Sequence, residues 1–276
     1  MSQSMDHLKD VMRRLRDPER GCPWDLKQSH ESLAQYMLEE AYEVVEVIED
    51  SDGLQTSSDK DHLCEELGDV LLQIVFHAQI ASENGDFDMD QIAQTVADKM
   101  IERHPHVFGD RAGVDTPQDV LKNWESDKAK KRAAKAAQDD KQHSLLDDVN
   151  TALPPLSRAL KLQSRAARVG FDWTNPADII AKIREETDEL EAEIQKGEKA
   201  ADAMEDELGD VLFVVVNLAR RLHIDPARAL RRTNRKFERR FRGIETALSA
   251  QNRKLIDATL DEMEALWIQM KEREQK

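Results

Sequence analysis

The chain has 276 residues, of which 35% are charged and 5% aromatic, and its formal net charge is -16. This acidity argues against unassisted binding to nucleic acids, because contacts with a phosphate backbone depend on cationic side chains. The length allows two domains of ordinary size, and the low aromatic, glycine and proline content favours long polar-faced helices over sheets. We therefore predict an all-α fold with two tandem helical-bundle domains.

Export and membrane segments are not expected. Residues 1–14 are polar and charged where a signal peptide would be apolar. The longest largely apolar runs, residues 70–76 and 211–216, fall far short of the roughly 20 residues that span a bilayer. Cys22 and Cys64 do not have the spacing of a zinc motif and are expected to be reduced thiols. We expect a soluble cytoplasmic protein with no membrane partner.

Clusters of glycine, proline and asparagine divide the chain into segments of helical length. Asn175 and Asp225 each precede a proline and are predicted N-caps, and Thr259 has the spacing of a capping box. Pro105, which lies between two histidines, is expected to end a helix rather than frame a metal pair. The predicted helices cover residues 4–16, 28–50, 59–84, 88–103 and 117–137 in the first half, and 155–169, 177–196, 200–223, 226–250 and 259–274 in the second.

A twelve-residue phrase occurs twice, as EELGDVLLQIVF at residues 65–76 and as DELGDVLFVVVN at residues 206–217. Other pairs flank it in the same order: CPWD with FDWT, EEAYE with EETDE, KMIER with KFERR, and WESDK with WIQMK. Paired landmarks in one order predict a duplicated domain. We expect a first domain at residues 1–137, a linker at 138–153 and a second domain at 154–276.

In each predicted domain, two helices carry a pair of acids beside the apolar face. On a helix that turns by about 100° per residue, Glu40 and Glu43 border the apolar stripe of their helix, and the other pairs do the same. Packing of the two stripes would bring four carboxylates together. The candidate metal ligands are Glu40, Glu43, Glu66 and Asp69 in the first domain and Glu186, Glu189, Glu207 and Asp210 in the second.

Such a cluster is costly without a counter-charge. Two like charges about 5 Å apart repel by roughly 3 kcal/mol at an effective dielectric constant of about 20, so the acids either take up protons or surround a cation. Oxygen-only ligands favour Mg²⁺, with Mn²⁺ as a substitute, over zinc or di-iron centres, which usually recruit histidine or cysteine. For one helix the alternative is a solvated acidic face, but four helices with matching offsets favour a metal site.

Basic and aromatic residues follow the acids in both halves. Lysine and arginine recur four residues apart and could hold phosphate oxygens, although each pair alone could be ordinary surface. A tryptophan lies one turn from a lysine, which suits stacking on a base beside a phosphate, although a lone tryptophan is more often core. These pairs are Lys99 with Arg103, Lys236 with Arg240, Trp124 with Lys128 and Trp267 with Lys271. Trp24 and Trp173 are expected to pack near the site.

With EExxE followed by ExxD in both halves, the chain resembles the MazG family of nucleoside triphosphate pyrophosphohydrolases. The resemblance extends to the tandem arrangement and to the KFERRF and WxxxK segments. It implies an all-α bundle that forms a homodimer, with Mg²⁺ held by four acids. It also implies hydrolysis between the α- and β-phosphates of a nucleoside triphosphate, releasing the monophosphate and pyrophosphate.

Carried over by position, the resemblance gives each matching residue a role. The metal ligands and catalytic residues of the second copy would be Glu186, Glu189, Glu207 and Asp210. The nucleotide contacts would be Lys182, Glu185, Lys236, Arg240, Trp267 and Lys271, with Lys99, Arg103, Trp124 and Lys128 as first-copy counterparts. Because 26 positions separate Glu40 from Glu66 but 21 separate Glu186 from Glu207, the first copy has an insertion. We expect the second copy to be the principal catalytic site.

Two alternatives stay open at this point, and the sequence argues against a third. A ferritin-like di-metal protein would need Glu-x-x-His pairs, and no histidine in this sequence has a glutamate three positions before it. A non-catalytic helical metal-binding or interaction protein would carry the acids as surface charge. A related all-α pyrophosphatase would act on a single nucleotide such as dUTP or dCTP.

Overall fold

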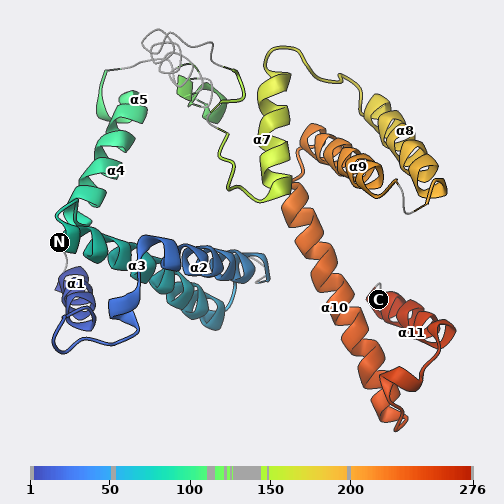
Figure 1. Ribbon diagram of the computed structural model, residues 1–276, viewed down its shortest axis with the longest axis horizontal. Coiled ribbons are helices and arrows are strands. Elements are labelled where there is room, and N and C mark those ends of the chain that lie inside the picture. Colours follow the sequence, from blue (N-terminus) through green and yellow to red (C-terminus); the bar gives the residue numbers. More distant parts are fainter. Residues whose placement is uncertain are drawn as a thin grey trace. The chain divides into compact units, whose positions relative to one another are not determined.

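The structure is a computed structural model and describes residues 3–50, 54–110, 116–120, 123–124, 126, 144–147, 149–197 and 200–274. Within these ranges the regular structure is helical and no strand occurs (Figure 1), which confirms the predicted all-α class. The chain divides into two compact units, Met1–Ala133 and Ala134–Lys276, called unit 1 and unit 2 below. None of the described helices is long and apolar enough to cross a membrane.

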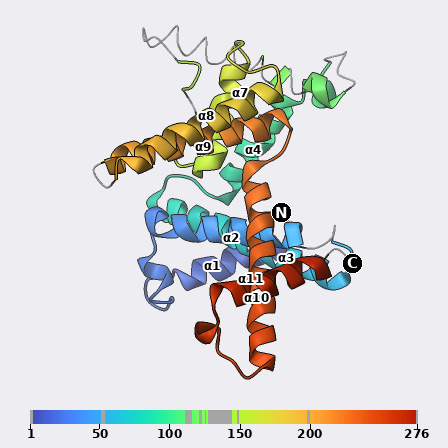
Figure 2. The same ribbon diagram turned by 90° about the vertical axis from the view of Figure 1, so that its right-hand side faces the viewer.

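Unit 1 is built around a pair of long helices. Helices α2 and α3 lie side by side, α1 packs against α3, and α4 follows α3 (Figures 1 and 2). The short helix α5 begins at Pro105, immediately after α4 ends at Arg103, so the proline ends one helix as predicted and starts another that was not. The helices are α1 (Gln3–Leu15), α2 (His30–Asp50), α3 (Ser57–Asn84), α4 (Met89–Arg103) and α5 (Pro105–Phe108).

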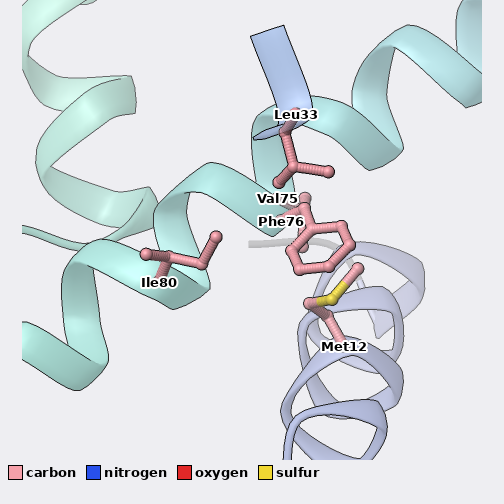
Figure 3. Packing of buried hydrophobic residues seen from close by; sticks show 5 residues of the cluster. All are labelled: Met12, Leu33, Val75, Phe76 and Ile80. Carbon is pink, nitrogen blue, oxygen red and sulfur yellow. The ribbon is translucent and has the colours of Figure 1, made fainter. Parts of the chain in front are cut away.

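The core of unit 1 forms where α1, α2 and α3 meet. Its buried side chains are aliphatic or aromatic, and Figure 3 shows the ring of Phe76 from α3 facing Met12 from α1. Trp24, in the loop before α2, meets the rings of Tyr36 and Phe76 edge-on at 5.8 and 6.4 Å between centroids. This packing joins α1 to the α2–α3 pair. The core cluster consists of Met12, Leu33, Val75, Phe76 and Ile80.

Unit 2 repeats this plan. Helices α8 and α9 form its central pair, α7 packs against α9, and α10 begins beside α7 and α9 before running away from them. Helix α11 packs against the far half of α10 (Figures 1 and 2). The helices are α7 (Pro155–Ala167), α8 (Pro176–Gln195), α9 (Ala201–Arg221), α10 (Pro226–Ala250) and α11 (Leu260–Arg273).

Local capping explains where the helices begin. The side chain of Asn175 accepts a hydrogen bond from the backbone of Ala177, and Asp225 caps α10 in the same way. Thr259 and Glu262 form the predicted capping box of α11. Each predicted helix with described bounds begins and ends within two residues of the observed one. Of the predicted helix 117–137, residues 117–120, 123–124 and 126 are described and helical.

Candidate functional site

Helices α8 and α9 bring three acids of unit 2 together. Glu186 projects from α8, and Glu207 and Asp210 project from α9, one turn apart. One carboxylate oxygen of each lies within 4.8 Å of the other two. Glu186 is buried, with 6% of its surface exposed, although isolated carboxylates are rarely buried without a partner. This triad is the unit 2 acid cluster.

The charges of the unit 2 acid cluster act on one another. Burial raises the pKa of Glu207, and the neighbouring charges of Glu189, Asp210 and Glu186 raise it further. Glu189 is therefore an electrostatic neighbour, but its oxygens are not in the group that converges within 4.8 Å. The local field disfavours the ionised form of Glu207 and favours the approach of a cation.

Lys182 supplies a positive charge at the edge of this cluster. Its ammonium group lies 2.8 Å from the carboxylates of both Glu185 and Glu186, and these two acids raise the pKa of Lys182. The three residues lie within one turn of α8, so the backbone fixes their proximity. The structure thus connects Lys182 and Glu185, both predicted nucleotide contacts, to the acid cluster.

Unit 1 has a matching unit 1 acid cluster. Glu40 and Glu43 of α2 and Glu66 of α3 bring carboxylate oxygens within 4.8 Å of one another. Burial is the main cause that raises the pKa of Glu40, followed by the charges of Asp69, Glu43 and Glu66. Asp69 is therefore an electrostatic neighbour of the unit 1 acid cluster, as Glu189 is of the unit 2 acid cluster. Both halves place three acids in close convergence and a fourth nearby.

Glu66 shows why the arrangement suits a cation. Its Oε1 lies 3.0 Å from Nε2 of His62, whereas its Oε2 is buried without a hydrogen-bond partner. A buried carboxylate oxygen left unpaired is costly, and a hard cation would satisfy it. His62 was not among the residues predicted for the site, although its position one turn before Glu66 could have indicated it. The carboxylate-only triads in both units fit Mg²⁺ or Mn²⁺.

A cavity of about 580 Å³ opens beside the unit 1 acid cluster. Its walls come from the C-terminal half of α2 and the first turns of α3, and they are mainly acidic. The lining residues are Glu43, Glu46, Val47, Asp50, Asp59, His62 and Glu66. The cavity extends the negative surface of the cluster without adding a described lysine or arginine.

The predicted basic and aromatic contacts of unit 2 gather on α10 and α11. The guanidinium of Arg240 lies 5.3 Å from the centroid of the Trp267 ring and 2.7 Å from Glu274. Lys236 and Lys271 are exposed, and neither forms an ion pair with another residue of the described chain. Because α11 packs on the far half of α10 (Figures 1 and 2), this single chain does not bring the group to the acids of α8 and α9.

The corresponding group of unit 1 lies at the end of α4. Trp124 donates its indole N–H to the backbone oxygen of Arg103 at 2.8 Å and meets the ring of His104 edge-on. Lys99 is exposed on the same helix. Lys128 lies outside the described residues. Trp124 is thus held by packing and a backbone hydrogen bond.

Comparisons with known proteins agree with this double architecture. The MazG nucleotide pyrophosphohydrolase domain matches residues 28–108 and 174–243, which contain the two acid clusters. The Escherichia coli K12 protein named nucleoside triphosphate pyrophosphohydrolase is 44% identical over 270 residues, covering 98% of both chains. The Thermotoga maritima protein named nucleoside triphosphate pyrophosphohydrolase/pyrophosphatase MazG is 41% identical, covering 95% of this chain and 93% of its own. This chain belongs to the MazG nucleotide pyrophosphohydrolase family.

Proposed function

We propose that the protein hydrolyses nucleoside triphosphates to the monophosphate and pyrophosphate with the help of Mg²⁺. The observation that carries this proposal is the convergence of Glu186, Glu207 and Asp210 in a chain that matches named pyrophosphohydrolases along almost all of its length. Three carboxylates within 4.8 Å need a counter-charge. A divalent cation that also carries a triphosphate provides it.

The acids of α8 and α9 hold this cation in our proposal. Glu186, Glu207 and Asp210 bind it, and Glu189 adds negative charge beside them. When bound, such a cation acts as a Lewis acid, which lowers the pKa of water and withdraws charge from phosphate oxygens. The burial of Glu186 and the partial burial of Glu207 lower the local dielectric constant and so strengthen their attraction for the metal.

Cationic side chains bind the triphosphate. Lys182 lies directly on the acid cluster, where it can leave Glu185 and Glu186 for a phosphate oxygen. Lys236, Arg240 and Lys271 form a second cationic group on α10 and α11, and Trp267 packs against it. These residues bind the nucleotide once α10 and α11 approach an acid cluster.

A homodimer provides such an approach, and we propose that this protein forms one. Leu208, Leu212 and Val215 make an apolar stripe along α9 that stays between 43% and 51% exposed in the single chain. Positions i, i+4 and i+7 lie on one helical face, so the stripe is continuous, and exposed stripes of this kind are typical of interfaces. A second copy packed on this stripe lets α10 and α11 of one copy reach α8 and α9 of the other.

Unit 2 is the principal catalytic unit in this proposal. When EEAYE is aligned with EETDE, Lys182 of unit 2 corresponds to Tyr36 of unit 1. Tyr36 packs against Trp24, so this position of unit 1 supplies no cation for phosphate. The stretch between the two acidic pairs is also shorter in unit 2, with 21 positions from Glu186 to Glu207 against 26 from Glu40 to Glu66. Unit 1 then acts as a weaker site or a structural partner.

The test is ³¹P NMR of a mixed pool of nucleoside and deoxynucleoside triphosphates incubated with the protein and Mg²⁺. Pyrophosphate as the first product supports the proposal, whereas orthophosphate as the first product shows that another bond is cut. Glu207→Gln should remove most of the activity, and Glu66→Gln should retain most of it. Full activity in Glu207→Gln with loss in Glu66→Gln would assign the reaction to unit 1.

A further inference from the structure

A cavity of about 260 Å³ lies between α7, α9 and the loop before α8 in unit 2. It is smaller than most pockets for drug-sized ligands, so it suits one planar ring system rather than a whole nucleotide. Aromatic rings and two amide side chains line it. The residues that carry the argument are Gln163, Phe171, Trp173, Phe213 and Asn217.

The aromatic walls of this cavity are unusually open. Phe171 is 80% exposed, Phe213 is 42% exposed and Trp173 is 37% exposed. Exposed apolar side chains that gather around a hollow are typical of ligand or partner sites. A flat heterocycle is the natural cover, because its face can stack on aromatic side chains.

Gln163 leaves a buried hydrogen-bond acceptor in this cavity. Its side chain is 6% exposed, and its Nε2 donates to the backbone oxygen of Phe213 at 2.7 Å. Because that carbonyl can only accept, the amide orientation is fixed. The remaining atom, Oε1, is buried without a partner. A ligand with an N–H group would satisfy it.

Asn217 supplies a polar group of the opposite kind. It is 5% exposed, and its Oδ1 accepts hydrogen bonds from Nε and Nη2 of Arg220 at 3.1 and 2.8 Å. Arg220 is held in turn by an ion pair with Asp172. The amide nitrogen of Asn217 is therefore its donor. An acceptor and a donor in one small cavity match the edge of a nucleobase, which presents both kinds of group.

The same position in unit 1 is filled by the protein itself. The repeated twelve-residue phrase aligns Asn217 with Phe76, which is 3% exposed and packs against Met12 (Figure 3). Trp24 packs on Phe76, whereas its counterpart Trp173 lines the cavity. Unit 1 therefore has a phenyl ring where unit 2 has an amide. Unit 2 is also the unit that has Lys182 at the edge of its acid cluster.

The cavity and the unit 2 acid cluster share a face of α9. Asn217 follows Asp210 by seven residues, so it lies on the same side, about 10 Å along the helix axis. We propose that this cavity binds the base of the nucleotide whose triphosphate lies at the acid cluster, and that Gln163 and Asn217 read the base edge. This inference rests on the proposed function, because it names the part of the same substrate that the acids do not touch.

Two pocket variants and one control test the proposal. Asn217→Phe copies the residue of unit 1 and fills the cavity, and Gln163→Met removes the acceptor at nearly constant volume. Both should raise the KM for nucleoside triphosphates at least tenfold. Lys161→Met, at an exposed position two residues away on α7, should leave KM within twofold of the wild-type value. A wild-type KM in both pocket variants would overturn the proposal.

A binding measurement separates this proposal from the proposed function. Saturation-transfer NMR with adenosine and cytidine monophosphates should transfer signal to the base protons in the wild type and lose it in Asn217→Phe. If the wild type releases no pyrophosphate from any triphosphate, the proposed function fails. A base signal that is present in the wild type and lost in Asn217→Phe would still support base binding in the cavity. Equal base signals in both proteins would overturn the cavity. If circular dichroism shows that Asn217→Phe is unfolded, the same NMR comparison with the wild type is made with Gln163→Met.

Discussion

The pKa of Glu207 depends on the burial of its side chain and on the charges around it. Burial and the charges of Glu189, Asp210 and Glu186 raise its pKa above the ordinary value of 4.5. The raised pKa means that the ionised form is less favourable in the folded chain than in the unfolded chain. At this group the metal-free protein therefore keeps its full stability below pH 4.5 and loses some of it as pH rises through the raised pKa.

The first prediction concerns Glu207→Gln. Without divalent metal at pH 8, the variant should melt at a higher temperature than the wild type, because the neutral amide removes the repulsion. Added Mg²⁺ should raise the melting temperature of the wild type and have little effect on the variant, since ligand binding to the folded state is lost. Differential scanning calorimetry with and without Mg²⁺ measures both effects.

Glu205→Gln is the matched control, because Glu205 is exposed on the same helix and outside the converging group. It should keep the wild-type response to Mg²⁺. If Glu207→Gln and Glu205→Gln responded alike, the converging carboxylates would not be the metal ligands.

A pair of histidines provides a second residue-scale test, in unit 1. Nδ1 of His30 on α2 lies 2.7 Å from Nδ1 of His77 on α3, and the two rings are stacked. Such a contact needs one nitrogen to donate and the other to accept. Burial lowers the pKa of His77, and the neighbouring His30 lowers it further. The contribution of His77 to stability is fully present above pH 6.5 and is lost as pH falls through its lowered pKa.

The second prediction follows from this loss of stability at low pH. His77→Gln should flatten the fall in the free energy of unfolding between pH 7.5 and pH 5.5, because glutamine can keep a hydrogen bond to His30 without titrating. Urea unfolding followed by circular dichroism across this range measures the slope. His223→Gln, at an exposed position after α9, should keep the wild-type slope; an unchanged slope in His77→Gln would contradict the role of the pair.

At the scale of the element, capping determines where α11 begins. Thr259 accepts from the backbone of Glu262, and the Glu262 carboxylate accepts from the backbone of Thr259 and from Arg253. The Arg253 guanidinium and the Thr259 backbone hold the pKa of Glu262 at about 2. The stability that the ionised Glu262 carboxylate contributes is present above the ordinary pKa of 4.5 and is lost as pH falls towards 2.

The third prediction is that Thr259→Ala destabilises the protein by about 1 kcal/mol, the usual cost of losing an N-cap. Denaturant titration at neutral pH measures it. Thr246→Ala serves as control, because the Thr246 hydroxyl bonds only to the carbonyl of Arg242 within α10, and its effect should be smaller. Equal losses in the two variants would show that the cap does not stabilise α11.

At the scale of the whole molecule, duplication gave two units with the same helical plan and different chemistry. Both retain a converging acid triad, yet one buries Phe76 where the other has Asn217 and a cavity. A filled core stabilises a unit, whereas a cavity with an unpaired acceptor costs stability. We infer that unit 2 exchanges some stability for binding.

The fourth prediction concerns assembly. Leu212→Glu places a charge in the middle of the exposed stripe of α9, so it should convert the proposed homodimer to a monomer, since burial of an unpaired charge is costly. Size-exclusion chromatography with light scattering measures the mass, which should halve. Val169→Glu, at a residue that is 70% exposed after the end of α7 and does not lie on α9, should remain dimeric. A monomeric wild type, or a dimeric Leu212→Glu, would contradict the proposal.

The sequence alone determined the all-α class, the positions of the helices and their caps, and the pairing of acids on each helix. These features depend on interactions three or four residues apart, which the printed order of residues already contains. The duplication made them easier to recognise, because Glu40 and Glu186, for example, occur in matching surroundings.

The tertiary structure decided which of those residues meet. It left Asp69 and Glu189 beside the converging triads, paired His62 with Glu66, and kept Arg240 and Trp267 on α10 and α11 rather than at the acids of the same chain. It also opened the cavity around Gln163 and Asn217. These outcomes depend on how separate helices and loops pack, and helical periodicity gives only the face of a side chain, not its distance from another helix.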